Sequence, residues 1–325
     1  MPTLTSEQVE HFEEFGFVKV DGVLDSGAVI DPIIDEYAGV LDNLAKELFE
    51  QGKISSLYEE LDFGERVTRI YEESGEVYNG YFDFSLPQSG IKPDTPFWAG
   101  PAVFKALTAD SLLDAVETIV GPEIYSNPVQ HVRIKVPESR APRDANGNVK
   151  FGATPWHQDN GVITEEADHT EMLTVWFPLM DADVSNGCLQ VVPGSHTGQL
   201  LTHCPGYRQA AGLTIPEHMF EVGAAMPVPL QKGSALFLHC KTVHSSLPNV
   251  SDRIRWSFDL RYHPIGQPTG RAAFPGFVAL SRKHPETELR DAQSWYLSWK
   301  EARDSLARGE QPTFNRWNSE DPVCA

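Results

Sequence analysis

Three side chains in the middle of the sequence are of the types that bind a catalytic metal ion. His157 and Asp159 are two positions apart, and His244 follows 85 residues after Asp159. In an extended segment, residues i and i+2 point to the same side, so an imidazole and a carboxylate converge. Two imidazoles and one carboxylate leave open positions on an octahedral metal, as in non-haem Fe(II) oxygenases. A His-x-Asp tripeptide alone is weak evidence, because a buried histidine more often only satisfies a hydrogen bond.

The segment that contains these residues, 125–264, is rich in short β-type runs separated by Gly, Pro, Asn and Asp. No long helical pattern interrupts these runs, which favours an antiparallel sandwich or barrel of the jelly-roll kind. The runs that predict strands are His131–Val136, Met172–Leu179, Leu189–Val192, Ala235–Leu238 and Arg255–Tyr262.

Residues 1–124 predict a mainly helical layer. Thr5 and Gln8 have the spacing of a capping box, and the helix they begin should end at Gly16, before a strand at 17–20. Apolar residues at helical spacing predict two further helices, over 30–48 and 111–120. Residues 265–325 form a C-terminal extension with a helical patch near 295–306. We therefore expect a single domain over 1–325, mainly β with flanking helices.

The composition excludes some partners. The chain has 325 residues, with 26 basic and 46 acidic side chains and a formal net charge of −20. Proteins that bind nucleic acids or anionic membranes do so through clustered Lys and Arg. Because acidic side chains are in excess here, neither is an expected partner. The four cysteines are sparse and form no C-x-x-C pair, which predicts free thiols in a reducing compartment. Without a secretory pattern at the start, we expect a cytoplasmic protein. The sequence predicts no oligomeric state.

The context of the three ligands is more specific than the ligands themselves. His157 and Asp159 lie in Trp156–Gly161, and the motifs Thr174–Leu179 and Asn186–His196 precede His244 and Arg255. In these motifs, and in its opening residues 4–24, the sequence resembles the phytanoyl-CoA dioxygenase family of Fe(II)- and 2-oxoglutarate-dependent oxygenases. The resemblance covers most of the chain but not the tail after about residue 265. It implies a double-stranded β-helix, a cupin-like jelly roll, in agreement with the strand pattern.

The resemblance also implies roles for individual residues. His157, Asp159 and His244 would be the iron ligands, and therefore the catalytic residues. Arg255, eleven residues after His244, would hold the distal carboxylate of 2-oxoglutarate, a task that suits a planar and permanently charged guanidinium. The further candidate contacts to this cosubstrate are Ser246, Lys135, Thr174 and Trp176. For Lys135 the alternative is a solvent-facing charge, and for Trp176 it is core packing.

Candidate walls of a substrate pocket come from two parts of the chain. Alternation on the strand 131–136 places His131 and Arg133 on one face with Lys135. An irregular aromatic stretch before residue 100 is as compatible with core packing as with pocket lining. Its candidate pocket residues are Tyr78, Tyr81, Phe97 and Trp98.

The implied reaction uses Fe(II), 2-oxoglutarate and O₂ to oxidise a C–H bond of a small molecule, with release of succinate and CO₂. Because Asp159 supplies a carboxylate where related halogenases have a small residue, hydroxylation is favoured over halogenation; desaturation, epoxidation and rearrangement would use the same ligands. The sequence shows no basic cluster for the phosphates of coenzyme A, so we expect a natural-product or amino-acid-like metabolite. The alternatives are a non-redox, cupin-like metal-binding isomerase or binding protein, and a degenerate oxygenase fold with a structural or regulatory role.

Overall fold

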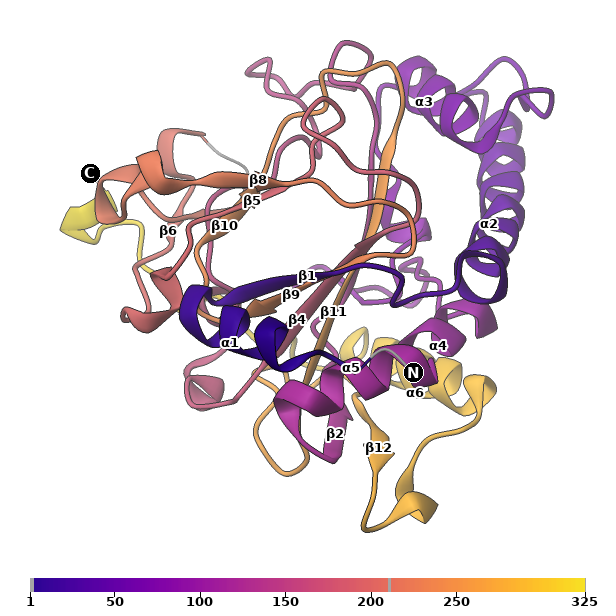
Figure 1. Ribbon diagram of the computed structural model, residues 1–325. Helices are drawn as coiled ribbons and strands as arrows, with labels where there is room; N and C mark the ends of the chain where they lie inside the picture. The colour runs from indigo at the N-terminus through magenta and orange to yellow at the C-terminus, as the bar shows by residue number, and fades with distance from the viewer. Residues whose placement is uncertain (1–2, 210–211, 325) are drawn as a thin grey trace.

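The computed structural model describes residues 3–209 and 212–324, and two antiparallel sheets form its core (Figure 1). The larger sheet has the order β1 (Phe17–Val20), β9 (Ala235–His239), β4 (Leu173–Pro178), β11 (Arg255–Pro264), β2 (Glu123–Ser126) and β12 (Phe277–Ser281), with β3 (His131–Lys135) also paired to β11. The smaller sheet has the order β10 (His244–Ser246), β5 (Leu189–Val191) and β8 (Met226–Val228), and a separate pair joins β6 (Cys204–Pro205) to β7 (Leu213–Thr214).

Helices cover the outer face of the larger sheet (Figure 1). Their bounds are α1 (Ser6–Phe15), α2 (Asp31–Glu50), α3 (Phe63–Ser74), α4 (Pro101–Leu107), α5 (Asp110–Val120) and α6 (Ala292–Leu306). The helices expected over 30–48, 111–120 and 295–306 correspond to α2, α5 and α6. On α2 the buried residues recur every three or four positions, from Ile33 through Tyr37, Leu41 and Leu44 to Leu48. This stripe is the face that packs on the sheet.

The two faces of β11 separate the helical core from the interior of the jelly roll. Trp256, Phe258 and Leu260 face the helices, where Trp256 stacks on Phe63 of α3 with ring centroids 4.3 Å apart. Such an aromatic pair contributes about 0.5–1.5 kcal/mol beyond its buried area. The alternate residues of β11, including Arg255 and Arg261, therefore point into the interior of the jelly roll. Both arginines are almost completely buried there.

The connection from α1 to β1 confirms the expectation from the capping residues. Thr5 and Gln8 form both bonds of a capping box, and α1 ends at Gly16 with φ of 78°. A side chain at Gly16 would place its Cβ 2.4 Å from the Nδ1 atom of His196. Glycine is therefore required here for its backbone conformation and for the close approach of a neighbour.

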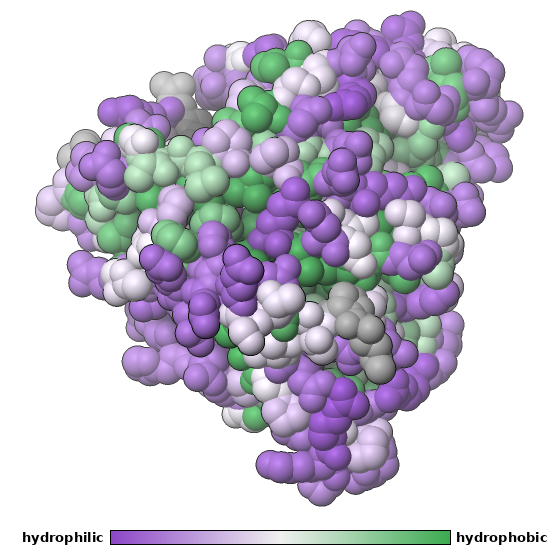
Figure 2. Space-filling model, in the orientation of Figure 1, coloured by the Kyte–Doolittle hydropathy of each residue, from purple (hydrophilic) through white to green (hydrophobic). Residues whose placement is uncertain are grey.

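The β core extends beyond the predicted range of 125–264. β1 pairs with β9, and β12, which follows that range, pairs with β2. The predicted helical layer and the C-terminal extension therefore each contribute a strand to the larger sheet. On the face in Figure 2 hydrophilic residues predominate, with apolar residues between them. Within residues 3–209 and 212–324, no helix combines the length and the apolar character needed to cross a membrane.

The prediction of four free thiols is wrong. Cys204 and Cys324 form a disulfide across 120 residues of sequence, whereas Cys188 and Cys240 are free and buried. Spacing along the chain did not reveal this pair, because the C-terminal tail folds back onto β6. The disulfide removes the thiol argument for a reducing compartment, and the cytoplasmic location stays a prediction.

Candidate active site

His157 and His244 are held side by side by the backbone. Each donates its backbone N–H to the carbonyl of the other, over 2.9 and 3.0 Å, and their ring centroids are 4.1 Å apart. The Nδ1 atom of His157 lies 2.8 Å from the carbonyl of Pro155, and that of His244 lies 2.9 Å from the carbonyl of Thr242. A carbonyl only accepts, so both Nδ1 atoms carry the proton. Both Nε2 atoms are then unprotonated in the neutral rings and available to a metal ion.

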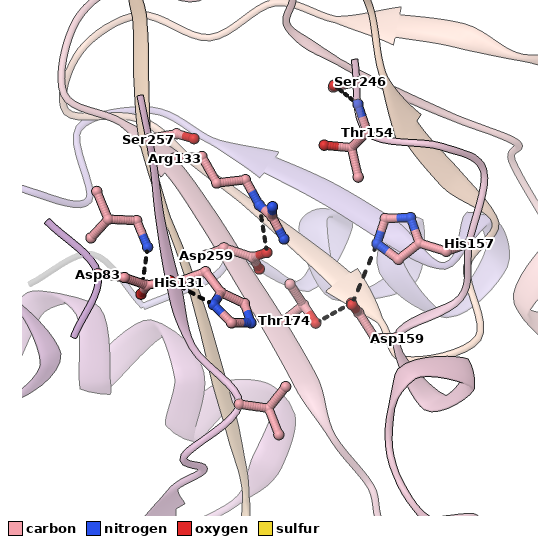
Figure 3. A network of polar contacts seen from close by, with 12 residues as sticks. Asp83, His131, Arg133, Thr154, His157, Asp159, Thr174, Ser246, Ser257 and Asp259 are labelled. Carbon is pink, nitrogen blue, oxygen red and sulfur yellow. Dashed lines mark hydrogen bonds and ion pairs between the residues drawn. The ribbon is translucent and has the colours of Figure 1, made fainter. Parts of the chain in front are cut away.

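Asp159 completes the group from the start of a short 3₁₀ turn, Asp159–Val162, after the extended residue Gln158. The carboxylate of Asp159 is fully buried, and its Oδ1 lies 3.9 Å from the Nε2 of His157 (Figure 3). One ligand atom from each of His157, Asp159 and His244 lies within 4.8 Å of the others. The three predicted ligands are thus close enough together to hold a metal ion.

Two neighbouring strands orient the Asp159 carboxylate. Thr174 on β4 donates its hydroxyl to Oδ2 over 2.5 Å, and Arg261 on β11 forms a buried ion pair with Oδ1. Thr174 and Arg261 are directly opposite each other in the sheet. Burial alone would raise the pKa of Asp159, but the charges of Arg261 and of the two imidazoles hold that pKa below its ordinary value. Asp159 is therefore an anion ready to bind a cation.

A metal requires the neutral form of imidazole, and the surroundings of His157 favour that form. Burial, together with the neighbouring His244, holds the pKa of His157 well below its ordinary value. The side chain of His157 is 12 % exposed, and it lines both cavities described below. Two neutral imidazoles and one carboxylate on one side of an ion leave its other side open to ligands.

A small inner cavity of about 10 Å³ lies against these ligands. It is lined by Arg133, Thr154, His157, Thr174, Trp176, Leu189, Leu238, His244, Arg255 and Asp259. Arg255 is fully buried and donates from Nη1 to the hydroxyl of Ser257, while its guanidinium lies 5.6 Å from the ring of Trp176. Its Nε and Nη2 atoms, on one edge of the guanidinium, have no partner within the described chain. Burial and the charge of Arg133 lower the pKa of Arg255 to about 9.

Of the other predicted cosubstrate contacts, Thr174 and Trp176 line the inner cavity, and Ser246 and Lys135 support it from behind. The ammonium of Lys135 donates to the hydroxyls of Thr154 and Ser246, and Ser246 accepts the backbone N–H of Thr154. Burial and the charges of Arg255 and Arg133 lower the pKa of Lys135 well below its ordinary value. Two arginines, Arg133 and Arg255, therefore line the inner cavity, against one carboxylate, that of Asp259.

An outer cleft of about 1280 Å³ also reaches His157. His131 and Arg133 of β3 line it, as their alternation predicts, and Figure 3 shows both on the same side of the strand. His131 lies 3.0 Å from the carboxylate of Asp83, and Arg133 lies 3.8 Å from that of Asp259. Although the sequence shows no basic cluster, the fold gathers seven basic side chains around this cleft. They are Arg133, Lys135, Arg143, Lys150, Arg208, Arg261 and Arg271.

The four aromatic residues proposed for the pocket lie elsewhere. Tyr78, Tyr81, Phe97 and Trp98 pack against the helical core, and none lines the inner cavity or the outer cleft. Tyr81 donates to Glu47 of α2, Trp98 donates to Glu36 of α2, and Phe97 stacks on Tyr296 of α6. These rings therefore fit core packing, the alternative interpretation, because the loops that carry them lie against the helices.

Two functional candidates were missed, Arg261 and Arg271. Arg261 has the same parity as Arg255 on β11, so strand alternation places both in the interior. That signal was present in the sequence, but the spacing to His244 pointed to Arg255 alone. Arg271 follows the predicted jelly-roll core, and no periodic pattern indicates where it points.

The C-terminal strap, residues 314–324, also contacts the ligand segment. Trp317 donates its indole N–H to the carbonyl of Gly161 over 2.6 Å, and Arg316 donates to the carbonyl of Asn160 over 3.3 Å. The Trp317 ring stacks on His203, whose Nε2 accepts the backbone N–H of Gln158 over 2.8 Å. The disulfide of Cys324 closes this assembly beside His203. The strap therefore secures the residues on either side of Asp159.

Comparison with known families assigns the chain. The family model for phytanoyl-CoA dioxygenase (PhyH) matches residues 12–257. The chain belongs to the phytanoyl-CoA dioxygenase family. It is 24 % identical over 277 residues to phytanoyl-CoA dioxygenase domain-containing protein 1 of Bos taurus, covering 79 % of this chain and 89 % of that protein. It is 24 % identical over 280 residues to the Caenorhabditis briggsae homologue, covering 78 % and 89 %. The predicted family is confirmed.

Solved structures share the fold. The apo form of ThoJ, a non-haem monooxygenase, matches with a TM-score of 0.57 and 18 % identity, over 92 % of this chain and 96 % of that one. EvdO2 from Micromonospora carbonacea var. aurantiaca, complexed with 2-oxoglutarate, matches with a TM-score of 0.50 and 21 % identity, over 82 % and 95 %. The predicted fold, a jelly-roll core with flanking helices, is confirmed.

Proposed function

We propose that this protein is an Fe(II)- and 2-oxoglutarate-dependent dioxygenase that hydroxylates a small molecule and releases succinate and CO₂. The observation that carries the proposal is the unpartnered edge of Arg255, buried in the same cavity as the metal-ligand group. An isolated buried guanidinium is costly, so the fold retains it for an anion that is bound during function.

The donor set fits Fe(II). His157 and His244 offer unprotonated Nε2 atoms, and Asp159 offers a carboxylate fixed by Thr174 and Arg261. Bound iron would supply the coupling of 2-oxoglutarate decarboxylation to oxidation of a substrate C–H bond.

The cosubstrate is a dianion, which the charge of Arg255 at the inner cavity complements, and the cavity would widen to admit it. Arg255 would hold the distal carboxylate through Nε and Nη2, which together match the two oxygens of a carboxylate. Trp176 lies against the Arg255 guanidinium, and Lys135 and Ser246 position Thr154 in the wall. Walls of Leu189 and Leu238 exclude water and strengthen these charge interactions.

Titration calorimetry tests this proposal. We expect 2-oxoglutarate to bind to the anaerobic Fe(II)-loaded protein and to bind weakly without metal. Arg255→Met should weaken binding by at least about 100-fold, because two charge-assisted hydrogen bonds of about 1.5–3 kcal/mol each are lost. Arg253→Met is the matched control, because Arg253 is half-exposed and pairs with Asp183 at the surface.

Turnover adds a second test. The Fe(II)-loaded protein should convert 2-oxoglutarate to succinate in air, and Asp159→Ala should abolish this conversion. Metal binding without any affinity for 2-oxoglutarate would instead favour a non-redox, cupin-like function. Equal binding of 2-oxoglutarate by wild type and Arg255→Met would show that the cosubstrate site has been misassigned.

A further inference from the structure

The outer cleft has the opposite charge to the rest of the molecule. Seven of the 26 basic residues line it, against two of the 46 acidic residues, Glu138 and Asp144. A concave surface lined by one sign of charge focuses the field and concentrates ions of the other sign. In a chain of net charge −20, this cleft is therefore a local site of attraction for anions.

Several of these cations already have partners. Arg261 pairs with Asp159 and Asp259, and Lys150 pairs with Glu76. Lys135 donates to two hydroxyls, and Arg143 donates to two backbone carbonyls. These contacts explain why the four side chains are where they are, without a ligand.

Arg271 is different. Its side chain is 1 % exposed, its Nη2 donates to the carbonyl of Val162 over 3.0 Å, and the ring of Phe314 lies 5.1 Å from its guanidinium. The Nε and Nη1 atoms have no partner among residues 3–209 and 212–324. No carboxylate within that part of the chain forms an ion pair with it. A buried cation in this state costs several kcal/mol unless an anion joins it.

The position of Arg271 links it to the metal-ligand group. Val162, which accepts its hydrogen bond, is the last residue of the 3₁₀ turn that begins at Asp159. Arg271 is also close enough to Arg261, the ion-pair partner of Asp159, for the two charges to repel. Arg271 and His157 both line the outer cleft, so a ligand at Arg271 would share the cleft with a metal ligand.

We propose that the substrate carries an anionic group, a carboxylate or a phosphate, which accepts a hydrogen bond from an unpartnered N–H of Arg271, at Nε or Nη1, in the outer cleft. This inference rests on the proposed function, because it assigns the substrate class of the same site. The field of the cleft would draw the anion in, and Arg271 would hold it beside the metal ligands. The cleft exceeds the roughly 300–1,000 Å³ of common small-molecule sites, so the substrate has a sizeable remainder beyond its anionic group.

Thermal unfolding with small anions tests the proposal. Wild type and Arg271→Met are loaded under argon with Fe(II) and with saturating 2-oxoglutarate. The bound 2-oxoglutarate then occupies Arg255. Sodium acetate, sodium phosphate and acetamide are then titrated at ionic strength held constant with chloride. We expect acetate, phosphate or both to raise the melting temperature of wild type saturably, and acetamide to have no effect. The stronger of the two anions distinguishes a carboxylate from a phosphate substrate.

The variant gives the decisive comparison. In Arg271→Met the anion concentration for half-maximal protection should rise at least about tenfold, the loss expected for one charge-assisted hydrogen bond. The control Arg282→Met, at an exposed arginine that pairs with Glu117 of α5 and does not line the cleft, should respond as wild type does. Equal protection of wild type and Arg271→Met, or protection of neither, would overturn the proposal.

A second measurement needs no variant. Crystals of the wild-type protein with metal and 2-oxoglutarate, soaked in sodium bromide, should show an anomalous bromide peak within hydrogen-bond reach of Nε or Nη1 of Arg271. No peak there would overturn the proposal even if Arg271→Met fails to fold. Failure of 2-oxoglutarate to bind in the same samples would instead count against the proposed function.

Discussion

Replacing Cys324 by serine should release the C-terminal strap and expose what the strap does for the metal-ligand segment. The disulfide with Cys204 spans 120 residues. The chain-entropy relation for a loop of that length gives an upper value of about 4.9 kcal/mol at 25 °C for the lost stability. Without the disulfide, the chain would no longer hold Trp317 and Arg316 at the carbonyls of Gly161 and Asn160.

The expected effect has two parts. Urea unfolding, followed by circular dichroism, should show a free energy of unfolding lower by about 2–5 kcal/mol in Cys324→Ser. Titration with Co(II), a redox-stable substitute for Fe(II), should show metal affinity about tenfold lower, as for loss of other groups that orient metal ligands.

The matched comparisons are the double variant, Cys204→Ser with Cys324→Ser, and reduced wild type. Both should behave like the single variant Cys324→Ser. The reasoning would be refuted by free energies of unfolding within about 0.5 kcal/mol of oxidised wild type, the range of ordinary surface substitutions. Unchanged Co(II) affinity with a large loss of stability would show that the strap stabilises the fold without positioning Asp159.

Three further predictions concern the buried charges, the histidines and a helix. Arg261→Met should lower the free energy of unfolding by about 3–5 kcal/mol, because it strands the buried Asp159 charge; a urea titration showing a loss of less than about 1 kcal/mol, as for surface pairs, would contradict this. Burial lowers the pKa of His203 and of His239 to about 4. The unfolded chain therefore binds protons that the folded chain does not, and the urea midpoint should fall between pH 6.5 and pH 5; a rise would contradict this. Gly39→Ala, in the exposed interior of α2 with open space around it, should raise stability by about 0.5–1 kcal/mol, which calorimetric melting would detect.

The sequence predicted the metal-ligand group because its chemistry depends on few residues with a distinctive context. His157 and Asp159 are two positions apart, and the residues around them match a family motif. The strands were predictable for a related reason, since β11 is buried on both faces and reads as a long β-type run. Arg255 was predictable from its spacing to His244.

The remaining features depend on contacts across the fold. Tyr78 and Trp98 were candidate pocket walls, but an aromatic run packs equally well under helices, and only the position of α2 distinguishes the two. The Cys204–Cys324 pair joins a tail with no recognisable motif to a two-residue strand, so no local signal marks it. Arg271 lies in the loop between β11 and β12, where no periodicity indicates the direction of a side chain.

The cross-strand pairing of His157 with His244 determines when iron can be loaded. The two imidazoles become neighbours only after segments 87 positions apart have joined through backbone hydrogen bonds, and neither bond involves a metal. A chain still lacking β10 has two of the three ligands, so the complete site forms only when these segments have paired. Because this pairing needs no ion, we expect the apoprotein to fold first and to bind the metal afterwards.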